Sequence, residues 1–208
     1  MEFFRRTAGQ PNRLAVFPGT FNPVTVAHIA LAKAALAVTD EVLFVLPRSF
    51  PHKTYTGATF AERVELLGLA LEELHGCSIA SSDGGLFVEI AAECRREYPE
   101  SAFSFLCGRD AAERIVRWNY GGSDKFSTML RQFDFLVAAR GGEYRPPAHQ
   151  QESFTVLELA NPLDHISASE IRRRISLGED WEDLVPRAVQ HRVREIYRPA
   201  NPTAPAPG

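Results

Sequence analysis

Short strand-like runs alternate with longer stretches of helical period, and this alternation constrains the fold more than any other feature of the sequence. Apolar, β-branched and aromatic runs predict strands at Leu14–Pro18, Glu41–Leu46, Cys77–Ala80, Ala102–Cys107, Phe133–Ala139 and Phe154–Leu159. Helical spacing predicts helices at Ala27–Ala37, Ala58–His75, Phe87–Tyr98, Arg109–Val116, Ala168–Leu177 and Pro186–Ile196. Repeated βα units of this kind build a parallel sheet with helices on its faces. We therefore expect an α/β fold.

The composition predicts a single domain. A chain of 208 residues, 45% of them hydrophobic, can bury one full core. We expect residues 1–12 to be an N-terminal lead and residues 13–197 to form the domain. Residues 198–208 are rich in proline and poor in bulky apolar side chains, so they predict a disordered tail.

The net charge limits the partners that we expect, and the cysteine content indicates the cellular compartment. The net charge of -3 provides no global attraction to nucleic acid or to an anionic membrane, so we expect neither as a partner. No stretch approaches the ~20 apolar residues that span a bilayer. The three cysteines are widely spaced, which favours reduced thiols and a cytoplasmic protein. The oligomeric state stays open, a homo-oligomer included.

The polar residues gather in loops that follow the predicted strands. In a parallel α/β sheet, ligands bind outside the carboxyl ends of the strands, near the point where the strand order reverses. The loops concerned are Gly19–His28, Pro51-His52-Lys53, Gly108-Arg109-Asp110, the loop at Arg140, and Ser167–Arg172. We expect these loops to meet at one edge of the sheet.

The first of these loops enters a helix. Thr25 and His28 are three residues apart and therefore share a helical face. At a helix N-terminus, a hydroxyl and an imidazole can hold a phosphate together with the backbone N–H groups. Capping of the helix by Thr25, with His28 on the surface, is the alternative interpretation.

The last loop, Ser167–Arg172, also enters a helix and also carries polar side chains that could hold a phosphate. Ser167 and Glu170 have the spacing of a capping box, while Ser169 and Arg172 lie three apart and can face a ligand. The planar guanidinium of Arg172 suits phosphate oxygens. Arg173 and Arg174 face other ways on the helix and are interpreted as solvated charges.

Two motifs carry a family resemblance. Gly19-Thr-Phe-Asn-Pro-Val-Thr-Val-Ala-His28 resembles the T/H-x-G-H signature of the nucleotidyltransferases that make dinucleotide cofactors, and Ile166-Ser-Ala-Ser-Glu-Ile-Arg172 resembles their I-S-S-T-x-x-R signature. Pro51-His52-Lys53, Gly108-x-Asp110, Trp118 and Leu184-Val185-Pro186 are similar to the nicotinate or nicotinamide mononucleotide adenylyltransferases. The resemblance implies a single Rossmann-like nucleotidyltransferase domain.

The same resemblance implies an activity: adenylyl transfer from ATP, with Mg²⁺, to a pyridine mononucleotide, which yields the dinucleotide of NAD biosynthesis and pyrophosphate. It implies catalytic roles for His28, Thr25, Lys53 and Arg172. It implies ATP binding by Gly19, Thr20, Phe21, His28, Gly108, Asp110, Ile166, Ser167, Ser169 and Arg172. It implies acceptor binding by Asn22, Lys53, Leu86, Phe87, Trp118 and Arg140.

Departures from the family pattern leave the acceptor open. Ala27 replaces the usual glycine, and Ala168 and Ser169 replace serine and threonine. Leu86-Phe87 stands where nicotinate enzymes carry hydroxyls, which favours weaker selection of a charged carboxylate. The sequence leaves three kinds of acceptor open: nicotinate mononucleotide, nicotinamide mononucleotide, and another phosphorylated compound such as phosphopantetheine. With the third kind, the transferred group is adenylyl or cytidylyl. A nucleotide-binding protein or ATP hydrolase without transfer activity is the alternative from another class.

Overall fold

The predicted parallel sheet is the centre of the fold. A computed structural model of the chain describes residues 1–48, 57–117, 133–138, 144–146, 148–159, 163 and 165–198. Within these ranges, a 7-stranded sheet has the order β1-β4-β3-β2-β5-β6-β7. Its strands are β1 (Glu2–Arg5), β2 (Arg13–Pro18), β3 (Glu41–Pro47), β4 (Cys77–Ser82), β5 (Ala102–Gly108), β6 (Asp134–Ala138) and β7 (Phe154–Leu157). β1 runs antiparallel to β4, and the other described pairs are parallel.

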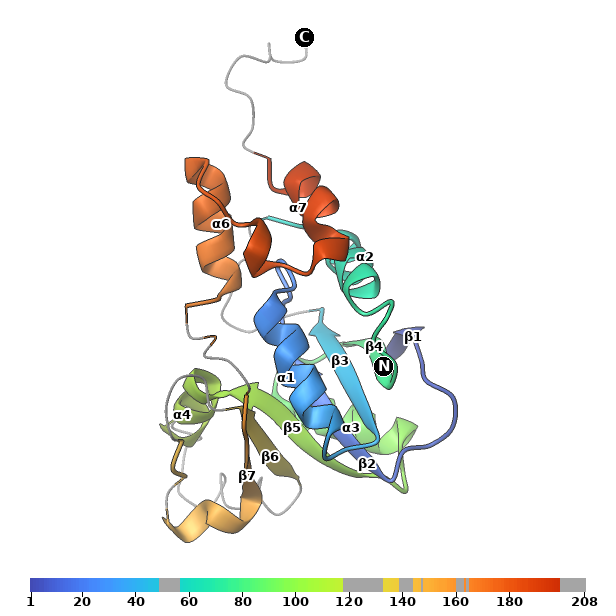
Figure 1. The fold of residues 1–208 in the computed structure, drawn as a ribbon. Helices are drawn as coiled ribbons and strands as arrows, with labels where there is room; N and C mark the ends of the chain where they lie inside the picture. Colours follow the sequence, from blue (N-terminus) through green and yellow to red (C-terminus); the bar gives the residue numbers. More distant parts are fainter. Residues whose placement is uncertain are drawn as a thin grey trace.

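Helices cover both faces of this sheet (Figure 1). They are α1 (Val26–Leu36), α2 (Phe60–Ala70), α3 (Phe87–Glu97), α4 (Arg109–Arg117), α6 (Ala168–Leu177) and α7 (Gln190–Ile196), with the 3₁₀ turns η1 (Ala148–Ser153), η2 (Glu182–Leu184) and η3 (Arg187–Val189). No helix in the described ranges is long and apolar enough to cross a bilayer.

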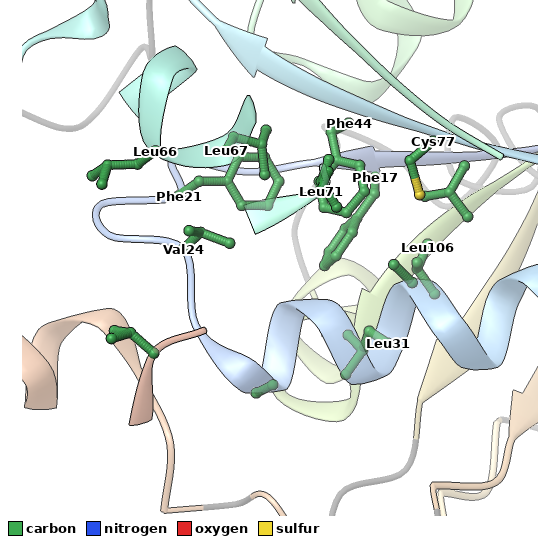
Figure 2. Close-up of a cluster of buried hydrophobic side chains, with 14 of the residues drawn as sticks. Phe17, Phe21, Val24, Leu31, Phe44, Leu66, Leu67, Leu71, Cys77 and Leu106 are labelled. Carbon is green, nitrogen blue, oxygen red and sulfur yellow. The ribbon is translucent and has the colours of Figure 1, made fainter. Parts of the chain in front are cut away.

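The core lies in two layers, one on each face of the sheet. Leu14 and Val16 of β2 belong to the layer that contains residues of α3 and α4, whereas Ala15 and Phe17 belong to the layer that contains residues of α1, α2, α6 and α7. Successive side chains of a strand point to opposite faces, so β2 is buried on both sides. Figure 2 shows part of the second layer, in which Phe17 and the α1 residue Leu31 lie among other apolar side chains.

Three details of the structure differ from the sequence predictions. β1 lies within residues 1–12, for which no element was predicted. The predicted helix to His75 ends at Ala70, and the Arg5 side chain binds the carbonyl oxygens of Leu71 and Leu74 beyond that end. The helix predicted from Pro186 begins one residue later, because Pro186 is its extended N-cap with ψ 139°. Its first three residues form the turn η3, and it is α-helical from Gln190. The predicted tail after Arg198 lies outside the described residues.

The strand order places the reversal point between β2 and β5. β2 pairs with β3 on one side and with β5 on the other, and Val16 lies opposite Phe105. The carboxyl ends of β2 and β5 are therefore neighbours, so the loop after Pro18 and the turn at Gly108 flank the place where such sheets bind ligands.

Candidate active site

The loop between β2 and α1 begins with a tightly packed glycine. A Cβ atom on Gly19 would lie 2.8 Å from Cζ of the Phe21 ring, so only glycine leaves room for that ring. Phe21 is 1% exposed, has a left-handed φ of 47° and packs on Phe17 and Phe44. Figure 2 shows Phe21 on this loop among the core side chains. The Phe21 ring is buried, so only the backbone of Phe21 is available for the predicted contact with ATP.

Thr25 and His28 form a capping box at the start of α1. The Thr25 side chain accepts a hydrogen bond from the His28 backbone N–H, and the Thr25 backbone N–H donates to Nδ1 of His28 at 3.0 Å. A backbone N–H can only donate, so Nδ1 is an acceptor and the neutral imidazole carries its proton on Nε2. The capping interpretation of Thr25 is confirmed, and the cap itself sets the tautomer and the orientation of His28.

Arg172 joins α6 to the β2–α1 loop. Its Nη1 donates to the carbonyl oxygen of Asn22, and its Nη2 lies 3.3 Å from Oγ of Ser169. The two motifs are thereby in contact, as the sequence predicted for their loops. A guanidinium has five N–H donors, so the same side chain can hold the loop and also donate to a phosphate.

The predicted capping box of α6 is only half formed. The Ser167 side chain accepts a hydrogen bond from the Glu170 N–H at 3.1 Å. The Glu170 carboxylate instead pairs with Arg173 and Arg174, which lowers the pKa of Glu170 to about 2. The reciprocal bond is replaced because two guanidinium groups lie within reach of the carboxylate. Arg173 and Arg174 are therefore ion-paired rather than simply solvated.

Asn22 is a buried junction. Its side chain is 2% exposed, and its Oδ1 accepts hydrogen bonds from the Tyr197 hydroxyl and from the Ala58 N–H at 3.3 Å. Gly57 packs against the same pair, since a Cβ there would lie 3.0 Å from both Asn22 Oδ1 and Tyr197 Cε1. Burial raises the pKa of Tyr197, which keeps its hydroxyl a donor. The role of Asn22 in acceptor binding stays a prediction, while these contacts place it at the joint of α6, α7 and the loop.

Sequence reasoning missed Arg63. This residue of α2 is 5% exposed, and its Nη1 donates to the carbonyl oxygen of Thr20 at 3.0 Å. It lies four positions before Leu67, which is itself four before Leu71, so it continues the buried stripe of its helix. The sequence signal that could have identified Arg63 is its position as a charged residue within an otherwise apolar stripe of the helix.

Some of the other predicted ATP-binding residues are buried, and the rest are exposed. Gly108 ends β5 as a buried residue, and α4 follows at once with Asp110 exposed in its first turn. Ile166, which precedes the α6 cap, is 5% exposed and belongs to the core layer that contains α1. Ser167 and Ser169 are exposed. Their roles in binding ATP stay predictions.

On the acceptor side, the start of α3 is apolar and capped by its own chain. Leu86 is 50% exposed, whereas the Phe87 ring packs edge-on against Phe105 at 4.7 Å. The Glu89 carboxylate accepts hydrogen bonds from the N–H groups of Gly85 and Leu86 at 3.0 and 2.9 Å. Lys53, Trp118 and Arg140, which the sequence also placed in the site, lie outside the described residues.

A helix N-terminus with an oriented imidazole is joined to a second helix by an arginine at the reversal point of a parallel sheet. This arrangement is suited to holding a phosphate and favours a nucleotidyltransferase class of α/β domain. Residues 16–174 match the family model described as cytidylyltransferase-like. A Moorella thermoacetica protein described as "Probable nicotinate-nucleotide adenylyltransferase" is 31% identical, over 91% of this chain and 94% of its own length. A Thermus thermophilus protein of the same description is 31% identical, over 89% of this chain and 100% of its own. The chain belongs to the cytidylyltransferase-like family and, within it, to the nicotinate-nucleotide adenylyltransferases.

Solved structures show the same fold. Plasmodium falciparum nicotinic acid mononucleotide adenylyltransferase complexed with NaAD superimposes with a TM-score of 0.70 at 17% identity, covering 89% of this chain and 97% of the other. The same enzyme complexed with APC gives a TM-score of 0.68 at 16% identity. The Rossmann-like fold is therefore confirmed, and the family model and the relatives confirm the family resemblance.

Proposed function

We propose that the chain transfers an adenylyl group from ATP to nicotinate or nicotinamide mononucleotide, producing the dinucleotide and pyrophosphate. The observation that carries this proposal is the bond from Arg172 to the Asn22 carbonyl, which joins two motifs separated by 150 residues. The relatives that share nearly the whole length of the chain are described as nicotinate-nucleotide enzymes, which supports a pyridine mononucleotide as acceptor.

The reaction needs alignment and charge stabilisation more than covalent chemistry. The 5′-phosphate of the acceptor attacks the α-phosphorus of ATP, and the bond to the pyrophosphate breaks. Nε2–H of His28 donates to the α-phosphate, because the bond from the Thr25 N–H to Nδ1 places the proton on that nitrogen. Arg172, and Lys53 as an expectation from sequence, hold the triphosphate. The attacking phosphate needs no general base, since its second pKa is about 6.

We propose that Mg²⁺ enters the site with ATP. In phosphoryl-transfer sites Mg²⁺ usually keeps several waters and binds substrate phosphates, where it neutralises developing charge. The chain's own part is to supply the N–H donors of α1 and the side chains of His28 and Arg172 around those phosphates. The cytoplasm is the proposed compartment, because the described cysteines are free buried thiols.

The test is a product assay with separate acceptors. The protein is incubated with Mg²⁺ and ATP plus nicotinate mononucleotide, nicotinamide mononucleotide or phosphopantetheine, and pyrophosphate and dinucleotide are quantified by chromatography. We expect both products with a pyridine mononucleotide. Transfer to phosphopantetheine alone, or acceptor-independent release of phosphate, would refute the proposal in favour of another transferase or a hydrolase.

His28→Ala tests the chemistry. Loss of a donor to a developing negative charge typically lowers kcat by about 10²–10³-fold. His75→Ala, at an exposed histidine beyond the end of α2, is the matched control and should keep kcat within about twofold. Turnover of His28→Ala near that of the wild type would show that the imidazole does not act on the α-phosphate.

A further inference from the structure

The Thr20–Asn22 turn is held through its backbone by two arginines from different helices. Arg63 of α2 donates to the Thr20 carbonyl at 3.0 Å, and Arg172 of α6 donates to the Asn22 carbonyl. The bound carbonyls belong to residues on either side of Phe21, whose ring is buried and whose φ is left-handed. The turn is therefore fixed in orientation by side chains as well as by packing.

Fixing a carbonyl also fixes the N–H of the same peptide plane. In a trans peptide these two groups point in opposite directions. With the Thr20 oxygen bound to Arg63, the Phe21 N–H points away from that guanidinium. Phosphate binding at a strand–helix turn depends on N–H groups held toward the ligand, and a small rotation of the plane removes such a donor.

The burial of Arg63 argues for more than a packing role. Arginine is almost never this deeply buried unless its donors are used, because taking the charge out of water is costly. The guanidinium also lies over the Phe60 ring, 5.5 Å from its centroid, so this ring restrains it as well as the Thr20 carbonyl. An apolar residue would fill the same stripe of α2 without the cost of desolvation, but it would leave the Thr20 carbonyl without this donor and the turn without a positive charge behind it.

We propose that Arg63 is a positioning residue for ATP: it holds the Thr20–Phe21 peptide so that the turn presents its N–H groups to the phosphates. This inference rests on the proposed adenylyl transfer. Arg63 acts through the turn rather than by touching the substrate, so it should affect ATP and leave acceptor affinity alone.

The test compares Arg63→Met and Arg63→Lys with Arg5→Met. Methionine keeps the apolar stem but removes the donors, whereas lysine keeps the charge and one donating group. Arg5 is the matched control: it also donates to main-chain carbonyls, those of Leu71 and Leu74, but beyond the far end of α2. Melting temperature, kcat and both KM values are measured for all three variants.

For Arg63→Met we expect kcat/KM for ATP to fall by about 10–100-fold, with KM for the acceptor unchanged within twofold. Arg63→Lys should recover part of the loss, and Arg5→Met should lower the melting temperature without changing the kinetic constants. If Arg63→Met is destabilised but keeps its kcat/KM for ATP, or if acceptor KM rises equally, the inference is wrong. If Arg63→Met does not fold, Arg63→Lys alone decides the test. A fall in its kcat/KM for ATP of at least about threefold supports the inference, and no fall overturns it.

ATP binding separates this inference from the proposed function. If the wild type makes no dinucleotide, the proposed activity fails, and calorimetric titration with Mg²⁺ and ATP still tests Arg63. Binding at least about tenfold weaker in Arg63→Met than in Arg5→Met supports the positioning role, and equal binding by the two variants overturns it.

Discussion

At the scale of single residues, Gly19 and Phe21 form one packing unit. The family resemblance assigned Gly19 to ATP binding. The structure adds a cause inside the chain, because the Phe21 ring occupies the space of the missing side chain. A glycine before a helix that is proposed to bind phosphate can thus serve the core and the site together.

Gly19→Ala should destabilise the fold by about 1–3 kcal/mol, the usual cost of overpacking, because its methyl group would press on a buried ring. Gly68→Ala is the contrasting variant. Gly68 lies within α2 with no atom within 4 Å of an added Cβ, so alanine there should stabilise by about 0.5–1 kcal/mol. Urea unfolding of both variants measures the difference; equal stability of the two would contradict the packing argument.

At the scale of elements, α6 depends on charge as well as on its cap. Arg173 and Arg174 donate hydrogen bonds to Glu170 and hold the pKa of this carboxyl at about 2, below its usual 4.5. The folded state therefore favours the ionised carboxylate. Its contribution to stability is fully present above about pH 4.5 and is lost as the pH falls toward 2.

Glu170→Gln should accordingly lower the urea midpoint at pH 7 and lose its effect as the pH falls between about 4.5 and 2. The ion pairs of Glu170 are accessible to solvent, so added salt should reduce the difference in urea midpoint between the variant and the wild type at neutral pH. Glu73→Gln, at an exposed residue just after α2, is the control. A difference between Glu170→Gln and the wild type that does not change with pH would exclude the ion pairs as its cause.

The C-terminal end of α7 is tied to the candidate site by a part-buried hydrogen bond, and the helix is tied to α2 by an exposed ion pair. The Tyr197 hydroxyl donates to Asn22, and Arg192 makes a two-pronged pair with Glu65 at 2.9 and 3.0 Å. The Tyr197 hydrogen bond and the Arg192–Glu65 ion pair allow the effect of attaching α7 to be separated from the effect of supporting the β2–α1 loop.

Tyr197→Phe should cost about 0.5–1.5 kcal/mol and lower kcat/KM for ATP, because Asn22 within the β2–α1 loop loses a hydrogen-bond donor. Arg192→Ala should cost less than about 1 kcal/mol and leave the kinetics unchanged, as is usual for exposed pairs. Urea unfolding and steady-state kinetics measure both variants. Kinetic losses of the same size in the two would mean that general loosening of α7, and not Asn22, is responsible.

At the scale of the whole molecule, the strands and most helices could be predicted because each leaves a local period in the sequence. β2, β3 and α6 occur where their patterns placed them. β1 was missed because its sequence, two adjacent phenylalanines between a glutamate and an arginine, forms neither an alternating pattern nor an apolar run. The site was predictable where it lies in motifs, but the contact of Tyr197 with Asn22 spans 175 residues, and nothing local announces such a contact.

The two-layered core makes a prediction for the molecule as a whole. Cys77 lies in the layer with α1, whereas Cys94 and Cys107 lie in the layer with α3, and burial raises the pKa of each thiol to about 12. At about pH 8 the native protein should therefore react slowly with a disulfide reagent at all three positions, since the thiolate is the reactive form. Peptide mapping of the labelled cysteines at increasing urea follows each layer separately.

Cooperative unfolding predicts that the three thiols become reactive at the same urea concentration, because both layers share the sheet and neither can open without it. ATP with Mg²⁺, the proposed ligand of the folded state, should move that midpoint upward for all three. Early labelling of Cys94 and Cys107, with Cys77 still protected, would instead show that the α3 and α4 face opens as a separate unit while the layer that carries the site stays intact.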